Sequence, residues 1–305
     1  MVPVMVILCV LARAINGALR VFGGRDVDPE KYPYVVRMEV KLIYNKFNLQ
    51  IQHFAHVCTA SVLKPTWTLT AGHCLSFEEH ASMFQMTMPG AKVEFLIRYG
   101  SKSGLRSQSD AFSDILEVVR HPGFKMLRTK EGDKVSNDVG LMKTTPIQLE
   151  QYGKLSAVNY PSLMGQPAVA VGYGLMREGD FVASTLLLGK ALQALDVVIK
   201  TCDKELARMS LTPIICLSRQ CREPGGAICP GDSGGPLIHH SGLVGINHMG
   251  PAIDCTLTYA KAGLSTNIVG IITPVSPFVE WITDQIKVKS NENNERSVNL
   301  QLRAN

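Results

Sequence analysis

A serine surrounded by glycines stands out in the second half of the sequence. Residues 231–237 read GDSGGPL, so Ser233 follows an aspartate and precedes two glycines. Glycine adopts backbone dihedrals that a side chain forbids, which allows the amide N–H groups next to Ser233 to converge on one point in space. Such a point suits a developing oxyanion. The segment therefore predicts a sharply turned loop that presents Ser233 as a nucleophile.

A serine hydroxyl is a weak nucleophile at neutral pH, so it needs a neighbouring base and a carboxylate that orients the base. Residues 70–74 read TAGHC, which places His73 next to a cysteine that can hold it. Residues 137–143 read NDVGLMK, a buried-strand pattern that opens on Asp138. The candidates follow the order His, Asp, Ser along the chain. Chymotrypsin-type triads have this order, whereas subtilisin and the α/β-hydrolases have different ones.

These motifs resemble those of the trypsin and chymotrypsin family of serine proteases. The resemblance covers residues 21–286, and its landmarks follow in the family's order. They are RVFGG at 20–24, WTLTAGHC at 67–74, AVAVGYG at 168–174 and SPFVEWI at 276–282. The resemblance implies an all-β fold of two antiparallel six-stranded β-barrels with a C-terminal α-helix, and an active site in the cleft between the barrels. It also implies a serine endopeptidase that works through an acyl-enzyme intermediate.

The composition agrees with a folded, mostly β chain. It has 305 residues, of which 46% are hydrophobic, enough to bury a large core. Runs rich in Val, Ile, Leu and Thr recur between clusters of Gly, Pro and Ser, and a helical pattern is nearly confined to residues 276–287. We expect one barrel at about 35–144, the other at about 160–275 and the terminal helix at about 276–287. A net charge of +5 without a long basic run does not support nucleic-acid binding.

The N-terminal end of the chain is expected to be removed by proteolysis, and the C-terminal end is expected to be a polar tail. Residues 1–14 contain an apolar run and an A-x-A cleavage pattern, typical of a secretory signal peptide, with an ordinary buried strand as the alternative. The run is too short to span a membrane. Residues 15–20 then form a short activation propeptide, residues 21–286 the protease domain and residues 287–305 a polar disordered tail. The sequence thus predicts a secreted, extracellular monomer.

The resemblance assigns a role to each candidate catalytic residue. His73 is the general base, Asp138 orients it and Ser233 is the nucleophile. The backbone N–H groups of Gly231 and Ser233 form the oxyanion hole. No metal ion or cofactor is expected. The expected partners are protein or peptide substrates, an activating protease and protein inhibitors, with no membrane partner.

The resemblance also implies activation by proteolysis. Cleavage between Arg20 and Val21 would free an ammonium group that folds inward and pairs with Asp232. An uncut chain lacks this counter-ion, so its oxyanion hole should be disordered and its activity low.

The substrate pocket is assigned by resemblance as well. Its floor is Ala227, six residues before Ser233, where trypsin-like enzymes have an aspartate. Without a carboxylate there, a buried Lys or Arg of the substrate would be unpaired, which disfavours trypsin-like specificity. The other pocket positions are Ile228, Gly250 and Gly263. Two small residues and an apolar one predict a preference for an aromatic or large aliphatic residue before the scissile bond.

The eight cysteines fit an oxidising compartment. Apart from Cys9 in the leader, the resemblance pairs six of them as Cys58–Cys74, Cys202–Cys216 and Cys229–Cys255. Cys221 is left over. A free buried thiol, an intermolecular bridge and an altered pairing with Cys216 are all open for it.

Two departures from the family concern the expected site. Thr59 and Ala60 stand where the family usually has glycines, and His248, in NHMG at 247–250, stands where it has a serine that contacts the catalytic aspartate. An imidazole there could compete for the hydrogen bonds of Asp138 or alter its charge; a one-residue alignment shift or a tolerated substitution are the alternatives. His248 therefore keeps a second hypothesis open, a catalytically weak homologue that acts as a binding or decoy protein. The remaining histidines considered for a metal are expected on solvated strand faces without one; they are His53, His56, His239 and His240.

Overall fold

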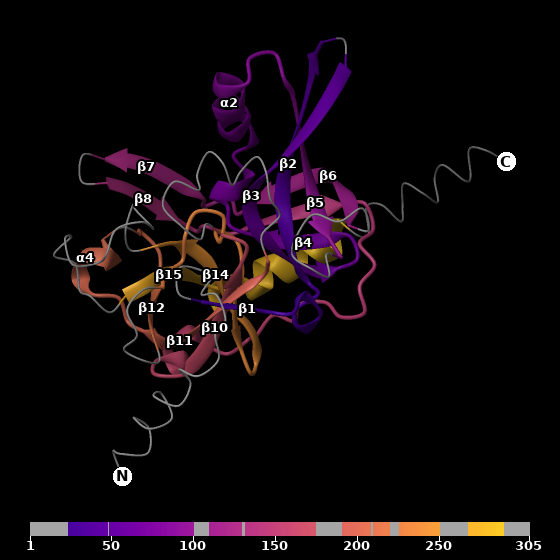
Figure 1. The fold of residues 1–305 in the computed structure, drawn as a ribbon. Coiled ribbons are helices and arrows are strands. Elements are labelled where there is room, and N and C mark those ends of the chain that lie inside the picture. The colour runs from indigo at the N-terminus through magenta and orange to yellow at the C-terminus, as the bar shows by residue number, and fades with distance from the viewer. Residues whose placement is uncertain are drawn as a thin grey trace, which may run out of the picture.

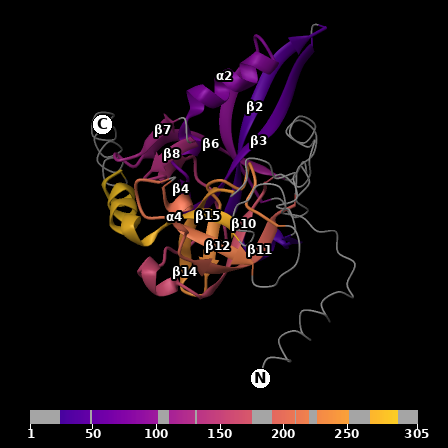
Figure 2. The ribbon, with the colours of Figure 1, turned by 90° about the vertical axis from the view of Figure 1, so that its left-hand side faces the viewer.

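The computed structural model describes residues 24–47, 49–100, 110–129, 132–174, 191–208, 210–219, 226–250 and 268–289. Most regular structure in these ranges is β, arranged as two antiparallel barrels (Figure 1). A quarter turn of the view keeps strands β2 to β6 above strands β10 to β14 (Figure 2). The predicted fold class is confirmed.

Six strands close the first barrel in the order β2-β3-β4-β9-β6-β5. β2 pairs along its whole length with β3, from Val35 opposite Ser61 to Lys46 opposite Leu49. They form a long hairpin that extends beyond the barrel at the top of Figure 1. The strands are β2 (Val35–Lys46), β3 (Leu49–Lys64), β4 (Trp67–Thr70), β5 (Lys92–Tyr99), β6 (Ala111–Arg120) and β9 (Gly140–Thr144).

The second barrel is a seven-stranded sheet in the order β1-β11-β10-β13-β14-β15-β12. It closes because β12 pairs back with β11, and β1 adds to the outside of β11. The strands are β1 (Arg25–Asp26), β10 (Pro167–Gly172), β11 (Gln193–Lys200), β12 (Ile215–Arg219), β13 (Pro236–His239), β14 (Gly242–Met249) and β15 (Ile268–Pro274).

Apolar packing holds the two barrels together. One buried cluster contains Tyr34 and Val62 of the first barrel as well as Leu243 and Ile246 of the second. A separate cluster fills the second barrel. Because each fully buried aliphatic side chain contributes about 1.5–3 kcal/mol, this shared core fixes the barrels against each other. Residues at their junction are therefore held at defined distances.

Helices are few, and two of them are not predicted by the sequence. α2 (Phe77–Thr87) buries only Phe84, so its apolar pattern is too weak to indicate a helix. The short α4 (Lys204–Ala207) is the other, and a hairpin of β7 (Lys125–Thr129) and β8 (Gly132–Ser136) also lies outside the barrels. Two 3-10 turns are Pro29–Lys31 and Tyr160–Leu163. No helix in the described part of the chain combines the length and apolar character needed to cross a membrane.

The C-terminal helix spans residues 279–289, after the 3-10 turn Ser276–Phe278. It therefore continues into the first residues of the segment predicted as a disordered tail. An ion pair of 2.7 Å between Nζ of Lys289 and Oε1 of Glu117 ties this end of the helix to β6. Residues 290–305 lie outside the described ranges.

Two disulfides join Cys58 to Cys74 and Cys202 to Cys216, both pairs that the resemblance implies. Cys229 is also disulfide-bonded. Its expected partner Cys255, like Cys221, lies outside the described residues.

Candidate active site

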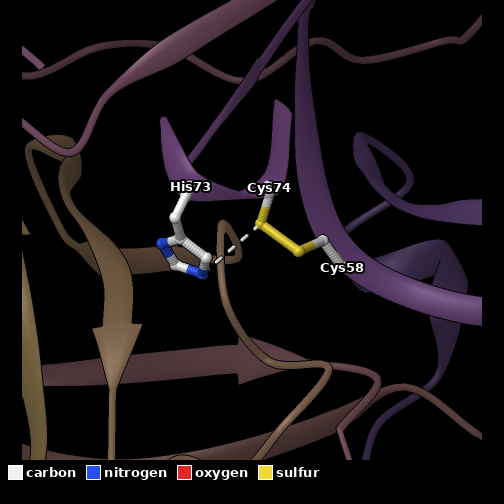
Figure 3. A group of neighbouring side chains, drawn as sticks. All are labelled: Cys58, His73 and Cys74. Atoms are coloured by element: carbon white, nitrogen blue, oxygen red, sulfur yellow. Dashed lines mark hydrogen bonds between the residues drawn. A yellow bond between two sulfur atoms is a disulfide. The ribbon is translucent and has the colours of Figure 1, made fainter. Parts of the chain in front are cut away.

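His73 stands where the chain leaves strand β4 of the first barrel. The chain passes from Thr70 into a 3-10 turn, His73–Leu75, in which Cys74 is disulfide-bonded to Cys58 on β3. Figure 3 shows this disulfide beside the imidazole, with Nε2 of His73 at 3.8 Å from Sγ of Cys74. A covalent tie on the next residue thus fixes the backbone that carries the imidazole.

Asp138 lies in a bend between β8 and β9. The bend depends on Asn137, whose φ of +48° is in the left-handed region that Asn tolerates better than most residues. Nδ2 of Asn137 donates to the carbonyl of Gly123 at 2.8 Å, and the N–H of Val139 donates back to the carbonyl of Asn137 at 2.7 Å. These bonds turn Asp138 inward, where only 3% of its side chain is exposed.

Two hydrogen bonds join His73 to Asp138. The backbone N–H of His73 donates to Oδ1 at 2.8 Å, and Nδ1 of its ring lies 2.8 Å from Oδ2. An ionised carboxylate only accepts hydrogen bonds, so Nδ1 carries the proton and Nε2 keeps the lone pair that a general base needs. Burial acts to lower the pKa of His73, but the charge of Asp138 and its hydrogen bond outweigh burial and raise it.

His248 on β14 contacts the same carboxylate. Its Nδ1 lies 2.5 Å from Oδ2 of Asp138, the atom that also accepts from His73. The two rings meet edge to face, with centroids 5.9 Å apart. Burial acts to raise the pKa of Asp138, but the charges and hydrogen bonds of His73 and His248 together hold it well below its ordinary value. The imidazoles of His73 and His248 therefore share one oxygen atom of Asp138, which is the competition for its hydrogen bonds that the sequence suggests.

Ser233 sits in the turn before β13, and its hydroxyl has a backbone partner on β14. Its Oγ donates to the backbone carbonyl of His248 at 3.3 Å. No hydrogen bond joins it to His73, although both residues are described. Hydrogen bonds of this kind often form only when substrate binds. The structure thus brings the imidazole and the carboxylate together and leaves the hydroxyl turned toward β14.

The loop of residues 230–235, called the nucleophile loop below, carries two backbone N–H groups with no hydrogen-bond partner among the described residues. Gly231 and Gly234 have φ values of +95° and +82°, which other residues rarely adopt. Neither the N–H of Gly231 nor that of Ser233 is engaged by another described residue.

Asp232 fixes the same loop from its other side. Its carboxylate is buried and accepts the backbone N–H groups of Gly174 at 2.7 Å and Cys229 at 2.9 Å. A Cβ on Gly174 would collide with Oδ2 of Asp232, so only glycine allows this approach. The expected cleavage site, Arg20 and Val21, lies outside the described residues.

The residues assigned to the pocket are only partly described. Ala227 and Ile228 are buried, and Ile228 belongs to the apolar core of the second barrel. Gly250 is half-buried at the end of β14, and Gly263 lies outside the described ranges.

Two groups of side chains in the described residues have metal-ligand chemistry. In the first, Cys58 and Cys74 are joined in a disulfide, so they offer no thiolate beside His73. In the second, Oδ2 of Asp138 lies 2.8 Å and 2.5 Å from the Nδ1 atoms of His73 and His248. Ligands at about 2.0–2.1 Å from a tetrahedral zinc ion stand further apart than this, so the second group fits shared protons better than an ion.

The structure corrects the expectation for two other histidines. His56 is half-buried rather than on a solvated face, and its Nε2 lies 2.9 Å from the carbonyl of Gly231 in the nucleophile loop. His239 is buried, and its ring lies 3.9 Å from that of the exposed His240. His53 stacks on Tyr44 at 5.5 Å.

Sequence reasoning did not identify His56 and Thr59 as parts of the site. Both donate to the carbonyl of Gly231, His56 at 2.9 Å and Thr59 Oγ1 at 2.8 Å. The only signal was the departure at Thr59 from the glycine that the family usually has. The departure at Thr59 shows that the residue differs from the family, but it does not show that Thr59 contacts Gly231, which lies 172 residues away in the chain.

Comparison with known proteins agrees with the geometry. The sequence profile of the family described as Trypsin matches residues 21–282. Trypsin from Phaedon cochleariae is 24% identical over 277 residues, covering 90% of this chain and 91% of that protein. Granzyme M from Homo sapiens is 25% identical, with 86% and 88% covered, and serine protease SSP1 from Scolopendra subspinipes is 27% identical, with 88% and 84% covered. The chain therefore belongs to the trypsin family of serine endopeptidases.

Proposed function

We propose that the chain is a secreted serine endopeptidase that is activated by cleavage between Arg20 and Val21 and hydrolyses peptide bonds through Ser233. The observation that carries the proposal is the hydrogen bond from Nδ1 of His73 to the buried carboxylate of Asp138. It selects the tautomer in which Nε2 is basic, as proton transfer from a serine hydroxyl requires.

In the acylation step, Nε2 of His73 accepts the hydroxyl proton of Ser233 while Oγ attacks the carbonyl carbon of the substrate. Asp138 stabilises the imidazolium that forms. The proton then passes to the leaving amine, the peptide bond breaks and the acyl group stays on Oγ. In the deacylation step, His73 accepts a proton from water while the water oxygen attacks the acyl carbonyl carbon. The bond to Oγ then breaks, Oγ takes the proton back from His73, and the carboxylic acid is released. For the first step, Ser233 must exchange its bond to the carbonyl of His248 for one to His73.

The negative charge that develops on the carbonyl oxygen is bound by the N–H groups of Gly231 and Ser233. Their lack of other described partners supports this role. Losing one such donor typically costs about a hundredfold to a thousandfold in rate.

A mixed peptide library tests the activity itself. The activated chain should cleave the library, as read by mass spectrometry, whereas Ser233→Ala should leave only background cleavage. Ser162→Ala, in an exposed turn, is the matched control and should cleave like the parent. Equal cleavage by Ser233→Ala would overturn the proposal.

For specificity, we propose a preference for aromatic or large aliphatic residues before the scissile bond. Ala227 carries no charge to pair with a substrate cation, and Ile228 adds apolar surface. Parallel assays of Phe, Tyr, Leu and Arg substrates should rank Arg last, and Ala227→Asp should raise the ratio of Arg to Phe cleavage. A dominant Arg activity in the parent chain would contradict the pocket assignment.

For activation, the new amino group of Val21 would pair with Asp232 and order the loop that carries Gly231. Chemical blocking of that amine after cleavage should abolish turnover. Full activity of the blocked chain, or of Arg20→Gln left uncut, would refute this step.

One observation favours the alternative of a weak homologue that acts as a binding or decoy protein. Oγ of Ser233 donates to the backbone carbonyl of His248 rather than to His73. The library assay decides between the two functions, because a decoy would bind peptides without cutting them.

A further inference from the structure

Thr59 links the first barrel to the nucleophile loop of the second. It lies on β3 directly after the disulfide-bonded Cys58, and it is fully buried. Its Oγ1 donates to the carbonyl of Gly231 at 2.8 Å and accepts the backbone N–H of Tyr173 at 3.1 Å. Its own backbone N–H donates to the carbonyl of Ser233 at 2.9 Å. One residue thus bonds to both residues whose N–H groups would form the oxyanion hole.

The carbonyl that Thr59 holds belongs to the peptide unit between Gly231 and Asp232. The N–H of this unit donates to the carbonyl of Cys229 at 2.9 Å, so the unit is held at both ends. A peptide unit is planar, which means that two fixed ends define its orientation. The two oxyanion donors belong to the peptide units on either side of it. Their directions therefore depend on this unit.

The loop needs such a restraint because of its glycines. Gly231 reaches its φ of +95° without a steric penalty, but it can reach other conformations as easily. A rotation of the unit would turn the donors away from the position of the oxyanion. Donors that are held in place before reaction stabilise the transition state more than donors that must reorganise.

We propose that Thr59 is a positioning residue for the oxyanion hole: its hydroxyl holds the carbonyl of Gly231 and thereby keeps the N–H groups of Gly231 and Ser233 aimed at the reacting oxygen. The proposal rests on the proposed function of Ser233. It goes beyond that function because glycine, the usual family residue at this position, has no side chain to make the contact.

Three substitutions separate the hydroxyl from the shape of the side chain. Thr59→Val keeps the volume and the β-branch but removes the hydroxyl, and Thr59→Ser keeps the hydroxyl. The matched control is Thr68→Val on β4, because Thr68 is equally buried and its hydroxyl has no hydrogen-bond partner among the described residues. Thermal unfolding of each variant identifies the temperature at which all are folded, and the assays are done there.

Thr59→Val should lower kcat by about tenfold to hundredfold, less than the loss of a direct donor, because the contact is indirect and His56 still holds the carbonyl. KM should not change, since the substrate pocket is intact. Thr59→Ser and Thr68→Val should retain the kcat of the parent chain.

Two inhibitors with the same peptide sequence distinguish a positioning role from a general structural one. The quantity measured is the affinity of each variant for both inhibitors. A peptide aldehyde adds the hydroxyl of Ser233 across its C=O bond, so its oxygen occupies the oxyanion hole, whereas the corresponding peptide alcohol binds only the pocket. Thr59→Val should weaken the aldehyde by the same factor as kcat/KM and leave the alcohol unchanged.

The proposal is overturned if Thr59→Val and Thr59→Ser have the same kcat and the same affinity for the aldehyde. It is also overturned if Thr59→Val lowers the affinity for the aldehyde and for the alcohol by the same factor. A parent chain that shows no hydrolysis dependent on Ser233 would instead refute the proposed function, so the two failures are distinguishable.

Discussion

The carboxylate of Asp138 accepts three hydrogen bonds from two residues. Oδ1 accepts the backbone N–H of His73, and Oδ2 accepts the Nδ1 groups of both His73 and His248. These donors keep the pKa of Asp138 low even though burial acts to raise it. The carboxylate is therefore held in its charged form, and the imidazole of His73 is the group whose protonation governs the base.

The raised pKa of His73 predicts opposite effects of pH on activity and on stability. Catalysis needs the neutral imidazole, so kcat/KM should rise with pH around a midpoint above 6.5, the ordinary value for histidine. The protonated imidazole is favoured in the folded state, so its contribution to the free energy of unfolding is full below pH 6.5 and is lost as pH rises through the folded pKa. pH profiles of kcat/KM and of urea unfolding, with His73→Gln as the control for stability, measure both.

Asp138→Asn should shift the acid limb of this profile to lower pH, because it removes the charge that raises the pKa of His73. A parent profile that is flat through about pH 5 to 8, the range in which histidine usually titrates, would contradict the assignment of His73.

His248 should support catalysis as a hydrogen-bond donor to Asp138. His248→Asn offers an amide N–H near the position of Nδ1, whereas His248→Leu offers none. A hydrogen bond to a charged group is worth about 1.5–3 kcal/mol, so His248→Leu should lower kcat/KM by about tenfold to hundredfold. Steady-state kinetics of both variants checks this. His248→Asn as impaired as His248→Leu would show that the donor is not what matters.

At the scale of elements, a buried ionic cluster joins three strands of the first barrel. Arg98 on β5 donates to Oε2 of Glu39 on β2 at 2.8 Å and to Oδ2 of Asp110, just before β6, at 2.9 Å. Its guanidinium also lies 4.3 Å from the ring centroid of Phe112. Arg98 and both carboxylates are buried. Such a cluster leaves costly uncompensated charges when one member is removed.

Arg98→Met should therefore lower the free energy of unfolding by about 3–5 kcal/mol, because it removes the guanidinium that donates to both buried carboxylates. The buried Arg37 still lies 3.8 Å from Oε1 of Glu39, so the loss comes mainly from Asp110. The control is the pair of Arg25 and Asp196 at 3.0 Å, whose side chains are 46% and 47% exposed. Arg25→Met should cost only about 0–1 kcal/mol. Urea unfolding of both variants measures the difference. Equal losses would mean that burial of the cluster does not determine its contribution.

At the scale of the whole molecule, the sequence predicts the fold because its signals are local. GDSGGPL marks one turn, TAGHC another, and short apolar runs indicate most of the strands. α2 was missed because only Phe84 among its side chains is buried, which leaves almost no apolar face to detect. The bonds of Thr59 and His56 to Gly231 were missed because no local pattern reports contacts between residues so distant in the chain. The orientation of the Ser233 hydroxyl toward the backbone carbonyl of His248 depends on how the turn before β13 lies against β14, and spacing along the chain cannot give it.

Covalent labelling of the cleaved chain with a serine-directed organophosphorus inhibitor tests the central claim most directly. The account predicts one adduct per molecule, located at Ser233 by peptide mass spectrometry, and its loss in His73→Ala. No adduct after cleavage between Arg20 and Val21, or an adduct that forms equally well in His73→Ala, would contradict it.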